Sequence, residues 1–287
     1  MALEGVLREL ALIVGTMLVV ATLVIVGPDR VIHAARGFRW RARAVALPLA
    51  ALGSVLLFRW WNQDLIQWLQ FRIVGIEFTS RIARFERWLF TENPVVLIQS
   101  LEAELLSSFF VFIYIHGYAF LLLFPFIAYF SLRTMDRFSS LVLAFTVNYA
   151  LGLLFYTLFI AYGPRNLIAI EVIPLLYEAH PQSGFLTYEV NQNTNVFPSL
   201  HTSLSVTVFL LAWITRDEYP LWTILSGFLA LSVMISTMYL GIHWFSDVLA
   251  GTILAAISVY VGVNYSLDGL RNSVVTFLQA HQRRSPQ

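Results

Sequence analysis

The chain has 287 residues, of which 58% are hydrophobic and only 12% are charged. A soluble domain is about half apolar and about a quarter charged, so this composition excludes an ordinary soluble protein and indicates an integral membrane protein. The sequence has no cysteine, which excludes disulfides and thiolate metal sites. Its formal net charge of +1 argues neither for nor against nucleic acid as a partner.

Apolar runs recur along the whole sequence. A membrane helix needs about 20 mostly apolar residues to cross the hydrocarbon core. The first run, Leu10 to Val26, follows acidic residues and precedes no small-residue cleavage site, so we expect a retained span rather than a signal peptide. Seven runs qualify, and they are roughly 10–27, 44–61, 109–130, 139–162, 199–215, 221–241 and 245–264.

These runs predict an all-α fold, a polytopic membrane helix bundle of about six to seven transmembrane helices. We divide the chain into four parts. The N-terminal transmembrane helices occupy 1–61, a segment without a span occupies 62–108, a membrane core occupies 109–264, and a cytoplasmic tail occupies 265–287.

The segment 62–108 mixes arginines with large apolar side chains, as in QWLQFRIVGIEFTSRIARFERWLF. Aromatic and aliphatic residues recur there at helical spacing. This pattern predicts amphipathic helices that lie in the membrane interface, while a helical cap packed on the bundle is the alternative.

The arginines orient the bundle. With seven spans the termini lie on opposite sides of the membrane, and the short loops on the C-terminal side carry the larger share of the arginines. The run FRWRAR at 38–43 contributes most of this excess. The positive-inside rule then predicts an integral protein of the cell membrane with a cytoplasmic C-terminus and an outward-facing polar loop at 163–198.

Three polar stretches lie far apart in the sequence, yet this topology brings them to the same outer face. They are AYGPRN at 161–166, NVFPSLH at 195–201 and LGIHWFSDVLAG at 240–251. We therefore expect their polar side chains to form one site.

The third stretch contains a histidine and a carboxylate at helical spacing. His243 and Asp247 are four residues apart, so on a helix they share one face. The carboxylate accepts a hydrogen bond from one ring nitrogen and leaves the other nitrogen basic and directed outward. An ion pair at a helix end is the alternative, but ionisable residues in membrane helices are functional candidates by default.

The other two stretches offer groups that bind anions. Pro198 has the fixed φ that favours the first turn of a helix, and backbone N–H groups at such a start bind phosphate readily. The Ser199 hydroxyl adds a donor, His201 lies in the same turn, and Arg165 offers a fork of donors that suits phosphate oxygens. A serine cap, a surface histidine and an interfacial arginine are the alternatives.

An anion cradle beside two histidines, one of them oriented by a carboxylate, is what phosphoryl transfer through a histidine intermediate requires. One histidine attacks phosphorus and the other protonates the leaving oxygen, while the cradle neutralises the charge on the transferring group. This chemistry needs no metal and no other cofactor. A metal site built from His201, His243 and Asp247 is an alternative, although it lacks further ligands.

At these residues the sequence resembles the type 2 phosphatidic acid phosphatase superfamily. The middle motif of that family usually reads P-S-G-H, and its last motif places a histidine four residues before an aspartate. Here the middle motif is PSLH at 198–201, and its leucine resembles the inositolphosphotransferase-like branch, which includes the fungal inositol phosphorylceramide synthases. YGPRNL and HWFSDVLAG resemble the first and last motifs of that branch, in the same order over residues 109–264.

The resemblance implies a role for each residue of the site. His243 is the nucleophile that becomes phosphohistidine, and Asp247 orients it. His201 protonates the leaving alkoxide, while Ser199 and Arg165 bind the phosphate. The core 109–264 is then the catalytic part of the chain.

Two positions depart from the phosphatase branch of the family. That branch has a lysine before its first arginine, and this chain has no lysine. It also has an arginine six residues before the nucleophile, where this sequence has Thr237. Tyr239 and Ser236 are candidates to contribute in their place, and Tyr239 and the mid-span His116 are candidates to line a substrate cavity.

The predicted function is that of a membrane phosphatase or phosphotransferase acting on a lipid-linked phosphate at the outer face. Water as the acceptor makes it a phosphatase, and a lipid alcohol makes it an inositolphosphotransferase-like enzyme. The alternatives from other classes are a transporter or scramblase with the same fold and a structural membrane subunit. We expect a lipid phosphate and the membrane as partners and no nucleic acid, and the sequence predicts no particular oligomeric state.

Overall fold

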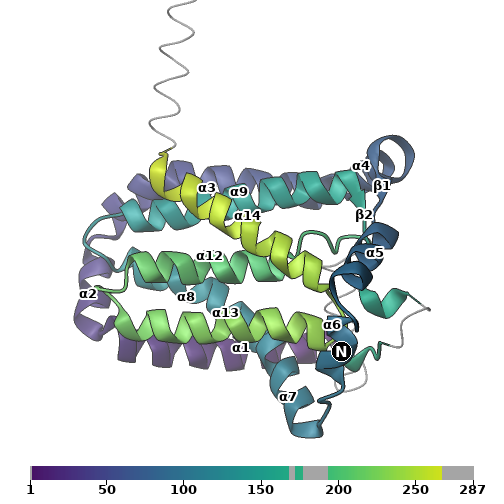
Figure 1. Cartoon of the computed structure of the whole chain (residues 1–287). Helices are drawn as coiled ribbons and strands as arrows, with labels where there is room; N and C mark the ends of the chain where they lie inside the picture. The colour runs from purple at the N-terminus through teal and green to yellow at the C-terminus, as the bar shows by residue number, and fades with distance from the viewer. Residues whose placement is uncertain (1, 168–171, 177–192, 267–287) are drawn as a thin grey trace, which may run out of the picture.

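The computed structural model describes residues 2–167, 172–176 and 193–266. Its long apolar helices run alongside one another, and the two strands of the described residues are each two residues long (Figure 1). In these residues six helical segments are long and apolar enough to cross a membrane, which confirms the predicted all-α polytopic bundle. They are Glu4–Val26, Phe38–Trp61, Glu104–Phe130, Asp136–Leu158, Pro220–Tyr239 and Phe245–Asn264.

The seventh predicted span, 199–215, forms the shorter apolar helix α12 (Leu200–Ile214). α12 packs against α9, α13 and α14, and most of its side chains are buried. The helix that carries the PSLH motif is therefore an inner helix of the bundle.

Three helices precede the segment without a span. The first helix continues into a short π-helix, and Gly27, with a φ of 82°, turns the chain into the second helix, which begins at Pro28. The bounds are α1 Ala2–Ala21, η1 Thr22–Val26, α2 Pro28–Arg36 and α3 Phe38–Trp61.

Short elements between α3 and α7 lie over one end of the bundle (Figure 1). The α5 helix turns Ile82, Ala83 and Glu86 inward and leaves Phe85 and Trp88 exposed. Its placement in a membrane interface stays a prediction, because the structure contains no lipid. The bounds are α4 Gln63–Leu69, η2 Gln70–Val74, β1 Ile76–Glu77, α5 Thr79–Leu89 and α6 Pro94–Gln99.

The remaining helices form the core of the bundle. Strand β1 pairs in parallel with β2, with Ile76 opposite Phe159, so the end of α9 is tied to the segment before α5. The bounds are α7 Glu104–Phe112, η3 Ile113–Gly117, α8 Tyr118–Phe130, α9 Asp136–Leu158, β2 Phe159–Ile160, η4 Pro164–Asn166, α13 Pro220–Tyr239 and α14 Phe245–Asn264.

A buried polar contact fixes α12 against α9. The Asn148 side chain donates to the Thr207 hydroxyl at 2.8 Å, and it accepts from the hydroxyl of Ser203. Hydrogen bonds between membrane helices contribute on the order of 1 kcal/mol each. Because all three side chains are fully or almost fully buried, the contact sets the register of α12 along α9.

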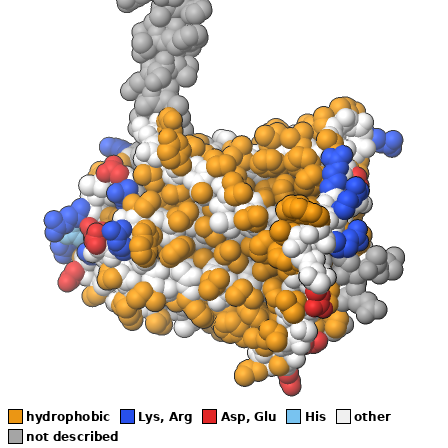
Figure 2. Space-filling view, in the orientation of Figure 1, with side chains coloured by type: hydrophobic (Ala, Val, Ile, Leu, Met, Phe, Trp, Pro, Cys, Tyr) orange, Lys and Arg blue, Asp and Glu red, His pale blue; other side chains and the backbone are white. Residues whose placement is uncertain are grey.

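The surface has the distribution expected of a membrane bundle. Figure 2 shows hydrophobic side chains over the middle of the visible face, with arginine, aspartate and glutamate gathered at its two ends. Most of the predicted cytoplasmic tail, from residue 267 onward, lies outside the described residues, and so does much of the predicted outward loop.

The contact between α12 and α14 depends on a residue without a side chain. A Cβ at Gly251 would meet the backbone oxygen of Ser199 and would approach the Thr202 Cβ to 3.1 Å. We expect Gly251→Ala to cost about 1–3 kcal/mol of stability in detergent, because backbone cannot yield as a flexible side chain does. Thermal unfolding with Gly53→Ala as the control tests this.

Gly53 lies inside α3 with nothing within 4 Å of its added Cβ. The control is therefore expected to unfold at the same temperature as the parent or slightly higher, by up to about 1 kcal/mol. Equal stabilities for the two variants would contradict the close packing of α12 on α14.

Candidate functional site

The starts of α12 and α14 meet at the end of the bundle that α5 covers. The Ser199 N–H donates to the Asp247 carbonyl at 3.0 Å. Ser199 is the N-cap of α12, and its hydroxyl accepts from the Thr202 N–H at 3.3 Å. The helix begins at Leu200, so Pro198 precedes the cap and does not occupy the first turn as expected.

His243 and Asp247 form a pair, but they do not share a helix face. His243 lies before α14, whose N-cap is Trp244, and its Nδ1 is 3.4 Å from the Asp247 Oδ2. The same oxygen accepts from the Trp244 N–H at 2.8 Å. One carboxylate oxygen therefore both caps the start of α14 and contacts the His243 ring. Within the described residues, Asp247 Oδ1 is buried without a hydrogen-bond partner.

The second histidine faces the first. The ring centroids of His201 and His243 are 5.8 Å apart. His201 is also held by Tyr114 and Tyr118, with ring centroids 4.9 Å and 4.7 Å away. The sequence pattern did not single out these tyrosines, because aromatic residues in a span are usually lipid-facing or packed.

The charge state of His243 follows from its surroundings. Burial lowers the pKa of its imidazole, and the charge of the nearby Arg165 lowers the pKa further, while the Val196 backbone carbonyl acts in the opposite direction. The ring is therefore neutral at pH 7. A neutral imidazole has a lone pair on one nitrogen, which a nucleophile requires.

Backbone contacts hold Arg165 beside this pair. Its N–H donates to the Gly241 carbonyl at 3.3 Å, and the Trp244 indole donates to the Tyr162 carbonyl at 2.8 Å. Gly241 follows α13 with a φ of 71°, a conformation that favours glycine. The first and third polar stretches are thus tied together by main-chain and indole hydrogen bonds.

Thr237 and the two candidates to act in place of the missing cations, Ser236 and Tyr239, form other contacts. Thr237 and Ser236 are buried, and their hydroxyls donate to carbonyls of their own helix. The Tyr239 hydroxyl lies 2.7 Å from Ser107 Oγ on α7, and the ring packs on Phe110. These contacts do not direct the three side chains toward His243.

His116 lies apart from this pair in its contacts. It is half-buried in the π-helix η3, and its ring stacks on Phe112 at 5.0 Å between centroids. Its role as a cavity residue stays a prediction.

Sequence reasoning missed one residue that the fold places directly behind the site. Glu86 on α5 is fully buried, and its Oε1 accepts from the Ser246 N–H at 2.7 Å and from the Ser246 hydroxyl at 2.8 Å. Burial raises the pKa of Glu86, the two hydrogen bonds from Ser246 lower it, and the nearby Asp247 raises it. The carboxyl therefore joins the segment 62–108 to the first turn of α14.

The comparisons with known proteins identify the family of the chain. A model of the PAP2 superfamily matches residues 80–261, which include all of α5 after its first residue and all three polar stretches. The chain belongs to the PAP2 superfamily. An uncharacterized protein of Methanocaldococcus jannaschii is 27% identical over 220 residues, which cover 73% of this chain and 84% of that protein. No solved structure matches the chain significantly.

Membership in the PAP2 superfamily supports a phosphatase-type activity on lipid phosphates. The match begins at residue 80, well before the motifs at 161–251. Glu86 thus lies within the part of the chain that the PAP2 model covers, although no motif recognised in the sequence contains it.

We expect Glu86→Ala to destabilise the protein by about 1.5–3 kcal/mol, because it leaves the Ser246 N–H and hydroxyl buried without their acceptor. Glu86→Gln keeps an acceptor oxygen and should cost less. Glu92→Ala, at an exposed position of the same segment, is the control and should lie within about 0.5 kcal/mol of the parent. Thermal unfolding in detergent measures all three.

The pH dependence provides a second readout. A buried acid with a raised pKa is protonated in the folded chain at pH values where the unfolded chain has lost the proton. Its contribution to stability is therefore lost as pH rises through the raised pKa. Glu86→Gln should remove this slope, and an unchanged slope would contradict the assignment.

Proposed function

We propose that this PAP2 protein transfers the phosphoryl group of a lipid-linked phosphate through a phosphohistidine at His243. The observation that carries the proposal is the placement of two histidine rings 5.8 Å between centroids, with the Asp247 Oδ2 3.4 Å from Nδ1 of one of them, His243. A phosphoryl group bound beside both rings would contact a nucleophile on one ring and a proton donor on the other.

The first half of the reaction uses both histidines. With the Nδ1 proton directed at Asp247, Nε2 of His243 attacks phosphorus, and the bond from phosphorus to the lipid oxygen breaks. The electron pair goes to that oxygen, which takes a proton from His201; the negative charge of the bound phosphate favours the protonated imidazole that this step requires. In the second half, water or an alcohol attacks phosphorus, the P–N bond breaks toward Nε2, and the attacking oxygen returns its proton to His201.

The phosphate is held by the remaining groups of the site. The Arg165 guanidinium neutralises charge on the phosphoryl oxygens, and the Ser199 hydroxyl, whose oxygen already caps α12, still has its proton to donate. Tyr114 and Tyr118 orient His201 by ring contacts. The missing lysine and arginine of the phosphatase branch leave Arg165 as the guanidinium that the motifs supply.

The arginine distribution supports an orientation of the site. The short loops at the end opposite the site carry the larger share of arginines, which favours a cytoplasmic C-terminus and an outward-facing site in the cell membrane.

A second candidate is transfer to a lipid alcohol, as in the inositolphosphotransferase-like branch. Leu200, in the third place of the PSLH motif, favours it. In this chain Leu200 packs over Gly152 of α9, where an added Cβ would lie 2.7 Å from the leucine Cδ2. The leucine therefore packs closely on a position without a side chain, and the acceptor is identified by the experiment below.

The decisive experiment follows radiolabelled phosphate from a lipid substrate, with and without a polyol acceptor. We expect an acid-labile, base-stable label on the protein in the parent, followed by free phosphate for hydrolysis or a new lipid for transfer. His243→Ala should lose turnover by about 10⁴-fold or more and take no label, while it still inserts and unfolds as the parent does. A labelled or active His243→Ala protein would contradict the mechanism.

A substrate with an acidic leaving group separates the role of His201. Nitrophenyl phosphate esters release nitrophenolate, a leaving group that needs no proton. The His201→Gln variant should therefore release a burst of about one equivalent of nitrophenol and then accumulate as the phosphoenzyme, because the second half of the reaction lacks its base. With an alkyl phosphate the same variant should lose about 10²–10⁴-fold in rate. Equal losses with both substrates, without a burst, would show that His201 is not the acid.

A further inference from the structure

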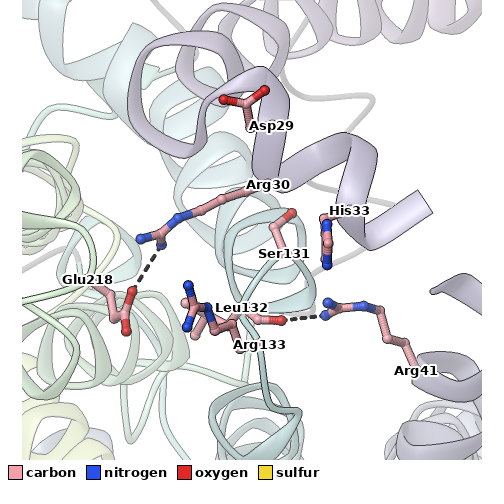
Figure 3. A pocket seen from close by; sticks show the side chains of 8 residues that line it. All are labelled: Asp29, Arg30, His33, Arg41, Ser131, Leu132, Arg133 and Glu218. Carbon is pink, nitrogen blue, oxygen red and sulfur yellow. Dashed lines mark hydrogen bonds and ion pairs between the residues drawn. The ribbon is translucent and has the colours of Figure 1, made fainter. Parts of the chain in front are cut away.

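A second polar pocket lies at the end of the bundle opposite the catalytic pair. It is a cavity of about 450 Å³ between α2, the start of α3, the turn after α8 and the turn between α12 and α13. Figure 3 shows its lining side chains, which are Asp29, Arg30, His33, Arg41, Ser131, Leu132, Arg133 and Glu218. Neither the motifs nor the proposed reaction uses any of them.

The charges of this pocket do not cancel. Arg30 is paired with Glu218 at 3.0 Å and lies over the Tyr219 ring at 4.9 Å, so its charge is already balanced. The Asp29 carboxylate is directed away from Arg41 and Arg133 (Figure 3). The three arginines and two carboxylates of the lining leave one positive charge in excess, and in the described residues neither Arg41 nor Arg133 forms an ion pair with a lining carboxylate.

Arg41 is the buried member of the pair, with 3% of its surface exposed. Its Nη1 donates to the Phe130 carbonyl at 2.7 Å and to the Leu132 carbonyl, and its Nε has no hydrogen-bond partner in the described residues. These partners are carbonyl dipoles rather than a carboxylate. An almost fully buried cation without a counter-charge is costly, and a nearby anion removes that cost.

Capping of a helix end explains part of this arrangement. Arg41 satisfies carbonyls at the C-terminus of α8, which is a common structural role for arginine. That role requires neither a cavity beside the guanidinium nor a second arginine and a histidine on the cavity wall. A topology anchor likewise requires arginines in the loops but no enclosed volume.

We propose that this pocket binds the phosphate group of an anionic ligand. Arg133 and His33 line the cavity and are exposed to solvent. Guanidinium groups bind phosphate oxygens through paired N–H donors. The volume lies within the usual range for ligand pockets, about 300–1,000 Å³. Charged side chains gather at this end of the molecule (Figure 2), where lipid head groups and dissolved phosphate esters are both available.

The proposal is independent of the proposed reaction, and its test must exclude phosphate bound at the catalytic site. Full-length protein carrying Arg165→Gln therefore serves as the background. One arm measures binding of radiolabelled inorganic phosphate in detergent. The other uses native mass spectrometry after extraction from vesicles of four parts phosphatidylcholine to one part phosphatidylglycerol, and it counts the anionic lipids retained.

We expect Arg133→Gln to weaken binding about tenfold or more in the arm that shows binding, because it removes a charge-assisted contact. Arg36→Gln is the matched control, since this exposed arginine of α2 lies at the same end of the bundle but outside the pocket lining. It removes the same charge and should change binding less than about twofold.

Retention of lipid alone would identify a head group, and binding of phosphate alone would identify a soluble ligand. Either result would support the proposal that this pocket binds a phosphate group. Equal effects of Arg133→Gln and Arg36→Gln would show a general surface charge and overturn the proposal. So would a background protein that binds neither probe. Arg133 is exposed, so failure of that variant to fold is not expected.

Discussion

The hydrogen bond from the Ser199 N–H to the Asp247 carbonyl is the contact on which the placement of the two histidines depends. It joins the first turns of two helices that start far apart in the sequence. Gly251 allows the close approach, because any side chain there would meet the Ser199 backbone. With the two helix starts in contact, His201 and His243 face each other without needing any direct bond between them.

Asp247 and Glu86 show how a membrane protein places carboxylates where water is scarce. Each has one oxygen in hydrogen bonds to the start of α14 and one buried oxygen with no partner in the described residues. A helix N-terminus offers donors and partial positive charge, which offset part of the cost of burial. Asp247 also contacts His243, whereas Glu86 contacts only the first turn of α14 through Ser246.

Sequence alone predicted the spans well, because each crossing requires about 20 apolar residues whatever its neighbours are. The spacing of His243 and Asp247 predicted their pairing but gave the wrong geometry, since the histidine precedes the helix and the aspartate caps it. The role of Glu86 could not be predicted from the sequence, because its burial depends on where α5 packs. A single glutamate among the arginines of 62–108 does not indicate whether it is buried. The sequence showed Leu200 only as one position of the PSLH motif. Its contact with Gly152 depends on how α12 packs on α9.

The length of α12 determines how deep the reacting groups lie. Its 15 residues rise about 22 Å, against a hydrocarbon core about 30 Å thick. Its far end is followed by the exposed charged residues Arg216, Asp217 and Glu218, which hold that end at the aqueous boundary. A helix of this length that starts at one boundary of the hydrocarbon ends short of the other, so the start of α12 at Leu200 is expected inside the apolar layer. For the proposed reaction, a site at that depth would take its lipid phosphate from within the bilayer, and water or a soluble acceptor would have to be admitted to it.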